Sequence, residues 1–121
     1  MTSGPERHDL TVPADPVMGA TIRVWVAEAG RTLGLGEAAI EDLRLLASEL
    51  FANGVTAGTD RLTLTLSGDG DGWVLGVDGV GPLGAEDLGG LPIGRLDLLR
   101  ALAHVEVGPD GTVRCTGSAT D

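Results

Sequence analysis

Two polar side chains, Glu49 and Asn53, stand four positions apart inside an apolar stretch that runs from Ile40 to Val55. On an α-helix this spacing stacks a carboxylate and a carboxamide on one face. The buried stripe of the same helix is marked by apolar and small residues at helical spacing, namely Leu43, Leu46, Ala47, Leu50 and Gly54. We therefore expect the polar pair along the border of the stripe, half shielded from water. A carboxylate and an amide held together there indicate a candidate site.

The pair also has a purely structural interpretation. Glu is a good helix former, Asn is tolerated near helix ends, and polar residues at this spacing commonly form a solvated helix face. Both interpretations stay open on the pair alone, so the rest of the chain must decide between them.

Length and cysteine content restrict the class of protein. A chain of 121 residues fits one domain that needs no disulfide framework, and we expect residues 8–121 to form it after a flexible leader of residues 1–7. The single cysteine, Cys115, is expected to be a small apolar side chain in a late strand. This cysteine usage, without a signal peptide, favours the cytoplasm.

The charge balance excludes further classes. The chain has 18 acidic and 8 basic residues and a net charge of -10, and all its cations are Arg. An acidic surface without a basic cluster repels phosphate backbones, so we expect no direct nucleic-acid binding. No apolar run approaches the roughly 20 residues that span a bilayer, so we expect no membrane segment.

The first half of the chain predicts one short strand and two helices. Residues 9–12 alternate as a strand does, and Asp15 before Pro16 is a suitable cap for a helix over residues 17–33. In that helix Ile22, Val26 and Ala29 recur at helical spacing. A second helix is expected from about residue 37 to residue 55, ending near Gly58.

The second half predicts hairpins around one more helix. Leucines at 62, 64 and 66 alternate with Thr, residues 67–72 form a turn, and residues 73–77 return as a strand. After a Gly-rich loop, a helix over about 93–103 precedes a final hairpin of residues 104–107 and 112–116. This order predicts an α+β fold, a two-layer sandwich of a mainly antiparallel sheet covered on one face by about three helices.

Other chemistry finds less support in the sequence. The acidic turn at 67–72 lacks the bidentate Glu that closes a calcium loop. A hydrolase that uses His104 or Cys115 is a poor alternative, because His104 is expected where a helix meets a strand, at an element end.

The ordered set of motifs resembles the GHKL ATPases, which have the Bergerat ATP-binding fold. The resemblance rests on Glu-x-x-x-Asn in the second helix, a strand leading into Asp78-Gly79-Val80-Gly81, a long loop, and Gly94-Arg95 opening a helix. It spans about residues 9–116 and is closest to small bacterial anti-sigma-factor serine/threonine kinases of partner-switching systems. No single motif carries it; the order of the motifs does.

The resemblance implies a role for each of these residues. Glu49 would be the catalytic base and Asn53 the magnesium ligand, and Asp78, Gly79 and Gly81 would line the adenine site. The loop over 82–92 would be a lid, and Gly94 and Arg95 would meet phosphate oxygens of ATP at a helix N-terminus.

Two positions depart from the family's pattern. In the motif Asp-x-Gly-x-Gly the first Asp accepts a hydrogen bond from adenine, and Val77 occupies that position here. Asp78, one residue later, could replace it only if the strand end is bulged or rotated. Leu96 stands where the phosphate-binding Gly-x-Gly has its second glycine.

The resemblance thus implies a regulatory protein that binds Mg-ATP. Its partners would be a sigma factor and an antagonist protein that it phosphorylates, and a homodimer could form through the stripe on the first helix, including Trp25. The alternative, favoured by Val77 and Leu96, is a non-catalytic module of the same fold that acts by protein–protein binding without ATP.

Overall fold

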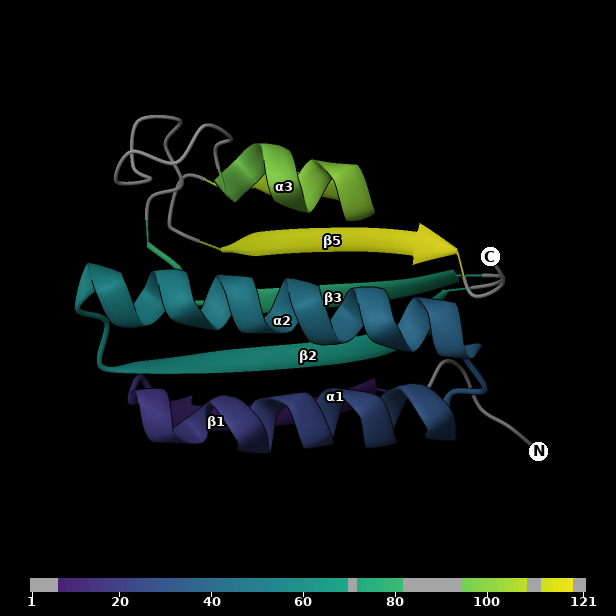
Figure 1. Cartoon of the computed structure of the whole chain (residues 1–121), viewed down its shortest axis with the longest axis horizontal. Helices are drawn as coiled ribbons and strands as arrows, with labels where there is room; N and C mark the ends of the chain where they lie inside the picture. Colours follow the sequence, from purple (N-terminus) through teal and green to yellow (C-terminus); the bar gives the residue numbers. More distant parts are fainter. Residues whose placement is uncertain (1–6, 70–71, 82–94, 109–111, 119–121) are drawn as a thin grey trace.

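The computed structural model describes residues 7–69, 72–81, 95–108 and 112–118 of the chain. These residues form two layers, a five-stranded antiparallel sheet and three α-helices that cover one of its faces (Figure 1). In chain order the elements are β1 (Arg7–Pro13), the short 3-10 helix η1 (Pro16–Met18), α1 (Gly19–Thr32), α2 (Glu37–Ala57), β2 (Arg61–Asp69), β3 (Gly72–Asp78), α3 (Arg95–Leu102), β4 (His104–Val107) and β5 (Val113–Ser118). The predicted α+β sandwich is confirmed.

The sheet has the strand order β1-β2-β3-β5-β4, and each neighbouring pair is antiparallel. Alternation decides which side chains face the helices: Leu62, Leu64 and Leu66 of β2 are fully buried, while the Thr residues between them are only half-buried. The hairpin between β2 and β3 is tighter than the predicted turn over 67–72, because the ladder continues to the pair Asp69 and Gly72.

The helices begin and end at residues suited to those positions. The carboxylate of Asp15 accepts a hydrogen bond from the Val17 backbone N–H at 3.0 Å, and Pro16 opens η1. The single helix predicted over 17–33 is therefore divided into η1 and α1. Helix α2 ends at Gly58, whose φ of 82° is in the left-handed region that glycine adopts without strain.

Helix α2 lies over the middle of the sheet, between α1 and α3 (Figure 1). Its predicted stripe is the centre of the core, since Leu43, Leu46, Ala47 and Leu50 have no exposed surface. The stripe of α1 is also buried, which leaves Val17 and Val24 as exposed apolar side chains near or on that helix and Trp25 half-buried.

Cys115 is fully buried in β5, and burial raises the pKa of its thiol to about 12. A thiol that stays protonated cannot act as a nucleophile, so Cys115 is a small apolar core residue, as predicted.

Two expectations concern residues at or beyond the edges of the described part of the chain. Strand β1 begins at Arg7, which pairs with Ser67, so the sheet includes the last residue of the predicted leader; residues 1–6 lie outside the described part. The loop over 82–92 and Gly94 also lie outside it. Within the described residues, no helix has the length and apolar character to cross a membrane.

Candidate functional site

Helix α2 places Glu49 and Asn53 one turn apart, and Asn53 reaches the turn that follows β3. The sequence predicts both at a half-shielded border, and Glu49 is indeed half-buried. Asn53 is more enclosed than predicted, with 8% of its surface exposed. A buried amide needs hydrogen-bond partners, because leaving one unpaired costs about 1–3 kcal/mol.

The Asn53 amide finds a partner in the turn that follows β3. Its nitrogen Nδ2 donates a hydrogen bond to the carbonyl oxygen of Val80, and the two atoms are 2.7 Å apart. Only the nitrogen of the amide can donate to a carbonyl, so this bond fixes which way the amide is turned. The amide oxygen Oδ1 is consequently directed away from the Val80 carbonyl.

The turn itself lies directly against α2. Gly79 and Gly81 have φ angles of 94° and 82°, which other residues rarely adopt. A Cβ at Gly81 would lie 2.7 Å from the Cβ of Ala57, and a Cβ at Gly54 would lie 2.9 Å from the carbonyl oxygen of Gly79. Glycines on both sides of this contact let the turn approach closely enough for Asn53 to reach Val80.

The strand end leading into the turn is regular. Val77 pairs with Leu64 and Asp78 with Thr63, with no bulge between them. Successive residues of a regular strand point to opposite faces, so Val77 is fully buried on the helix side while Asp78 is exposed on the other. The Asp78 carboxylate accepts a hydrogen bond from the Thr112 hydroxyl. The bulge or rotation that would turn Asp78 towards the helices is not present.

The predicted phosphate-binding residues are described only in part. Arg95 is the first residue of α3, but its side chain and that of Leu96 lie outside the described part, as does Gly94. The structure therefore brings Asn53, Gly79 and Gly81 together, with Glu49 one helical turn away, and places Asp78 on the face of the sheet opposite to the helices.

The described residues contain no group of three or more His, Cys, Asp or Glu side chains that could hold a metal ion. Mg²⁺ in nucleotide sites is commonly held by one or two protein oxygens together with phosphate oxygens of the substrate. The side-chain oxygen of Asn53 is of the kind that Mg²⁺ accepts as a ligand.

A second feature of α2 could not be found by spacing alone. Ser48, Ala52 and Val55 of α2 line a groove together with residues of η1 and the start of α1. Arg23 and Ser48 carry polar groups there, yet in sequence each looks like an ordinary polar position on a helix.

Comparison with known proteins supports the architecture. No protein-family model matches the sequence, and no curated protein matches it. Among solved structures, the chain is similar to the crystal structure of the RsbU and RsbW domains of Rv1364c from Mycobacterium tuberculosis, with a TM-score of 0.66 and 19% sequence identity. The match covers 95% of this chain and 32% of that chain. At this identity the likeness establishes the fold alone: the described chain shares an α+β fold with part of that structure.

Proposed function

We propose that this chain is an ATP-binding regulatory protein of the kind represented by the anti-sigma-factor serine/threonine kinases. In this proposal it binds Mg-ATP, phosphorylates a serine or threonine of an antagonist protein, and sequesters a sigma factor in the cytoplasm. Support comes from the fold, which is similar to that of the RsbU and RsbW domains, and from the order of the sequence motifs.

The observation that carries the proposal is the fixed orientation of the Asn53 amide. Because Nδ2 is held by the Val80 carbonyl, the amide oxygen, the kind of atom that binds Mg²⁺, is turned away from that carbonyl, and Glu49 stands one helical turn before Asn53. An amide that exists only to satisfy the core has no need of a carboxylate one turn away.

The roles follow from the chemistry of phosphoryl transfer. Bound Mg²⁺ would neutralise the charge of the ATP phosphates. Asn53 would hold the metal, and Glu49 would accept the proton of the attacking hydroxyl. Gly94 and Arg95 are proposed to meet the phosphates at the start of α3, where free backbone N–H groups favour anions.

The part of the proposed site that would bind adenine offers fewer suitable groups than the part around Asn53. Gly79 and Gly81 let the turn lie against Arg61 and Ala57, and the buried Val77 cannot accept a hydrogen bond from the adenine amino group. A hydrogen bond to a charged acceptor contributes about 1.5–3 kcal/mol, so its loss weakens binding roughly tenfold to a hundredfold. Asp78 is proposed to act indirectly, by holding the strand end through Thr112.

Phosphotransfer tests the proposed activity. Purified protein is incubated with radiolabelled ATP, magnesium and candidate antagonist proteins encoded in the same genome. We expect label on a serine or threonine of one antagonist. The Glu49→Ala variant should lose transfer but keep ATP binding, because the carboxylate acts on the hydroxyl and not on the metal. Transfer that is unchanged in this variant would remove Glu49 from the mechanism, and no transfer to any candidate would refute the kinase assignment.

A second candidate function is favoured by one observation, the outward-facing Asp78 beside the buried Val77. Without an acceptor for adenine, the fold could serve as a non-catalytic module that sequesters a regulatory protein. This candidate requires that partner affinity is the same with and without nucleotide and survives replacement of Glu49 and Asn53. A strong dependence of partner affinity on nucleotide would exclude it.

A further inference from the structure

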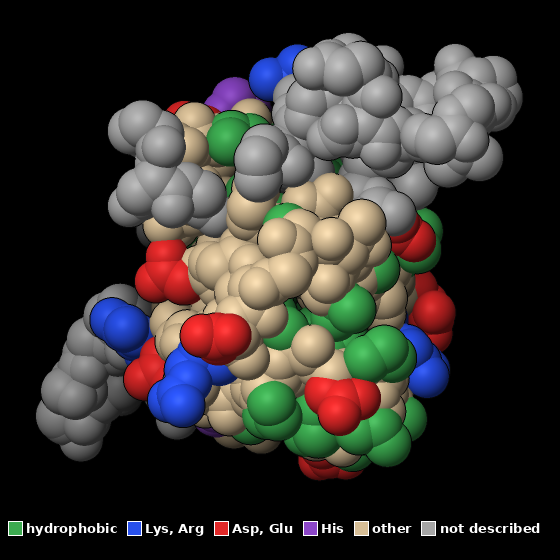
Figure 2. Space-filling model, turned by 90° about the vertical axis from the view of Figure 1, so that its left-hand side faces the viewer, with side chains coloured by type: hydrophobic (Ala, Val, Ile, Leu, Met, Phe, Trp, Pro, Cys, Tyr) green, Lys and Arg blue, Asp and Glu red, His purple; other side chains and the backbone are tan. Residues whose placement is uncertain are grey.

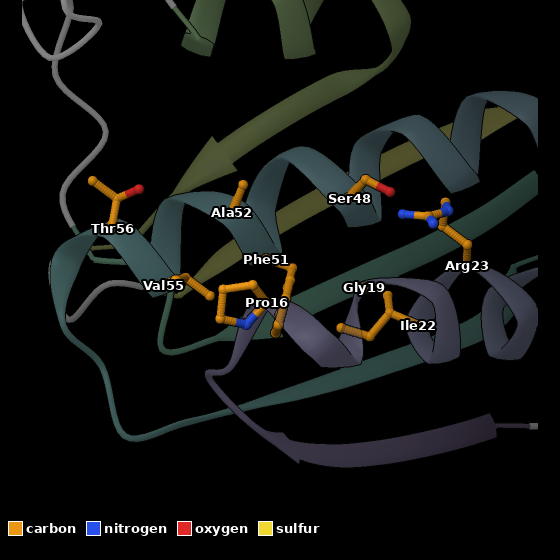
Figure 3. Close-up of a pocket in the computed structure, with 9 residues that line it drawn as sticks. All are labelled: Pro16, Gly19, Ile22, Arg23, Ser48, Phe51, Ala52, Val55 and Thr56. Carbon is orange, nitrogen blue, oxygen red and sulfur yellow. The ribbon is translucent and has the colours of Figure 1, made fainter.

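A groove lies between the start of α1 and the last turns of α2 (Figure 3). Its volume is about 290 Å³. It is lined by residues from η1, α1 and α2, namely Pro16, Gly19, Ile22, Arg23, Ser48, Phe51, Ala52, Val55 and Thr56.

One part of the groove is apolar. Figure 3 shows Pro16, Phe51 and Val55 close together, and Phe51 and Ile22 form the floor, since they are 4% and 0% exposed. The exposed Val17 adjoins this part in sequence, with 74% of its surface exposed. In Figure 2, which views the end of the molecule where α1 begins, hydrophobic side chains gather at the lower right. Pro16, Phe51 and Val55 therefore give this part of the groove an apolar wall.

The other end of the groove is polar, and its polar groups lack partners within the described residues. The Ser48 hydroxyl is buried and makes no hydrogen bond there. Figure 3 shows this hydroxyl turned towards the guanidinium of Arg23. A buried hydroxyl without a partner costs about 1–3 kcal/mol. A ligand group that forms a hydrogen bond with this hydroxyl would remove that cost.

Arg23 differs from the other arginines on this side of the molecule. Arg31 lies 3.7 Å from Glu28 and Arg44 lies 3.3 Å from Glu41, so each has a carboxylate close by. No carboxylate of the described residues lies within ion-pair distance of Arg23, although the chain carries a net charge of -10. Its guanidinium folds back over Gly19, where a Cβ would lie only 3.5 Å from Nη1. A cation without an internal counter-ion is therefore held at the mouth of an apolar groove.

We propose that this groove binds a small amphipathic carboxylate, with its apolar body against Phe51 and Val55 and its carboxylate paired with Arg23 and Ser48. Guanidinium and carboxylate match in shape and charge, and the hydroxyl can donate a further hydrogen bond. At about 30 Å³ per non-hydrogen atom, the groove holds roughly ten such atoms, which is about the size of octanoate. The lining of the groove shares no residue with the proposed nucleotide site.

The probe for this proposal is sodium octanoate, titrated into ¹⁵N-labelled protein without nucleotide. We expect saturable shifts of the backbone amide signals of Gly19, Ser48 and Ala52, with a dissociation constant of about 0.1–1 mM for a ligand of this size. Octanol, which has the same chain without the charge, should bind about tenfold more weakly, and added salt should weaken octanoate binding because Arg23 is exposed.

Two variants and one control locate the binding. Arg23→Gln should weaken octanoate binding about tenfold, and Ala52→Leu should abolish the shifts by filling the groove. Arg114→Gln is the matched control, because Arg114 is an exposed arginine of β5 that does not line the groove, and this variant should bind octanoate as the wild type does. Shifts scattered over the whole surface, or equal affinity of the wild type and Arg23→Gln, would overturn the proposal.

Discussion

The contact between α2 and the turn after β3 can be tested by adding one methyl group, in the variant Gly54→Ala. A Cβ at this position would lie 2.8 Å from Cδ2 of Leu62 and 2.9 Å from the carbonyl oxygen of Gly79. Leu62 is fully buried in the core, and the carbonyl belongs to a backbone turn with two positive φ angles. Both distances are shorter than real Cβ contacts, so one of the two neighbours must shift to admit the methyl group.

The expected magnitude is a difference between two terms. Replacing Gly by Ala inside a helix stabilises the folded state by about 1 kcal/mol. Overpacking a core costs about 1–3 kcal/mol, and the upper value applies here because the methyl meets obstacles on two sides. We therefore expect Gly54→Ala to lower the free energy of unfolding by about 2 kcal/mol.

Urea unfolding followed by circular dichroism measures this loss. With an m-value of about 1.5 kcal/mol per molar urea, the midpoint should fall by roughly 1 M. Gly19→Ala is the matched control, because its Cβ would meet only the end of the Arg23 side chain at 3.5 Å and should leave stability unchanged or slightly raised. If Gly54→Ala is as stable as the wild type, the turn does not pack closely against α2, and the account of the Asn53 site is wrong.

Three further predictions concern the core and the site. Burial raises the pKa of the Cys115 thiol to about 12, so iodoacetamide should label the native protein only as fast as the protein unfolds. Rapid labelling at mildly alkaline pH would contradict the buried position of β5. Gly117→Ala would place a Cβ 2.3 Å from the ring of the buried Trp73, so we expect a loss of about 2–3 kcal/mol in urea unfolding and a shifted tryptophan emission; wild-type emission would show that the ring does not lie on this glycine. Asn53→Ala removes the donor to the buried Val80 carbonyl and should cost about 1–3 kcal/mol by the same assay, whereas no loss would mean that this bond is not formed in solution.

Elements whose signal lies within a few residues could be predicted from the sequence. The alternation of Leu62, Leu64 and Leu66 identifies β2 because a strand repeats every two residues, and the stripe from Leu43 to Gly54 identifies α2 because a helix repeats every 3.6. Boundaries were less accurate, since the β2–β3 ladder extends further than the glycines of the turn suggest.

The arrangement of the candidate site could be predicted only in part. The spacing of Glu49 and Asn53 places them on one helix face, but the bond from Asn53 to Val80 joins residues 27 positions apart. It depends on close approach through Gly54, Gly79 and Gly81, which no local pattern encodes. The facing of Asp78 also required the register of the sheet, because a shift of one residue would have turned it to the helices.

The central claim is that Asn53 holds the magnesium of a bound nucleotide, and isothermal titration of Mg-ATP into the wild type and Asn53→Ala tests it most directly. Circular dichroism at the titration temperature first confirms that the variant is folded. The account predicts weak but saturable binding by the wild type that requires magnesium, and loss of this binding in the variant. No binding at millimolar nucleotide, or equal binding by both proteins, would contradict it.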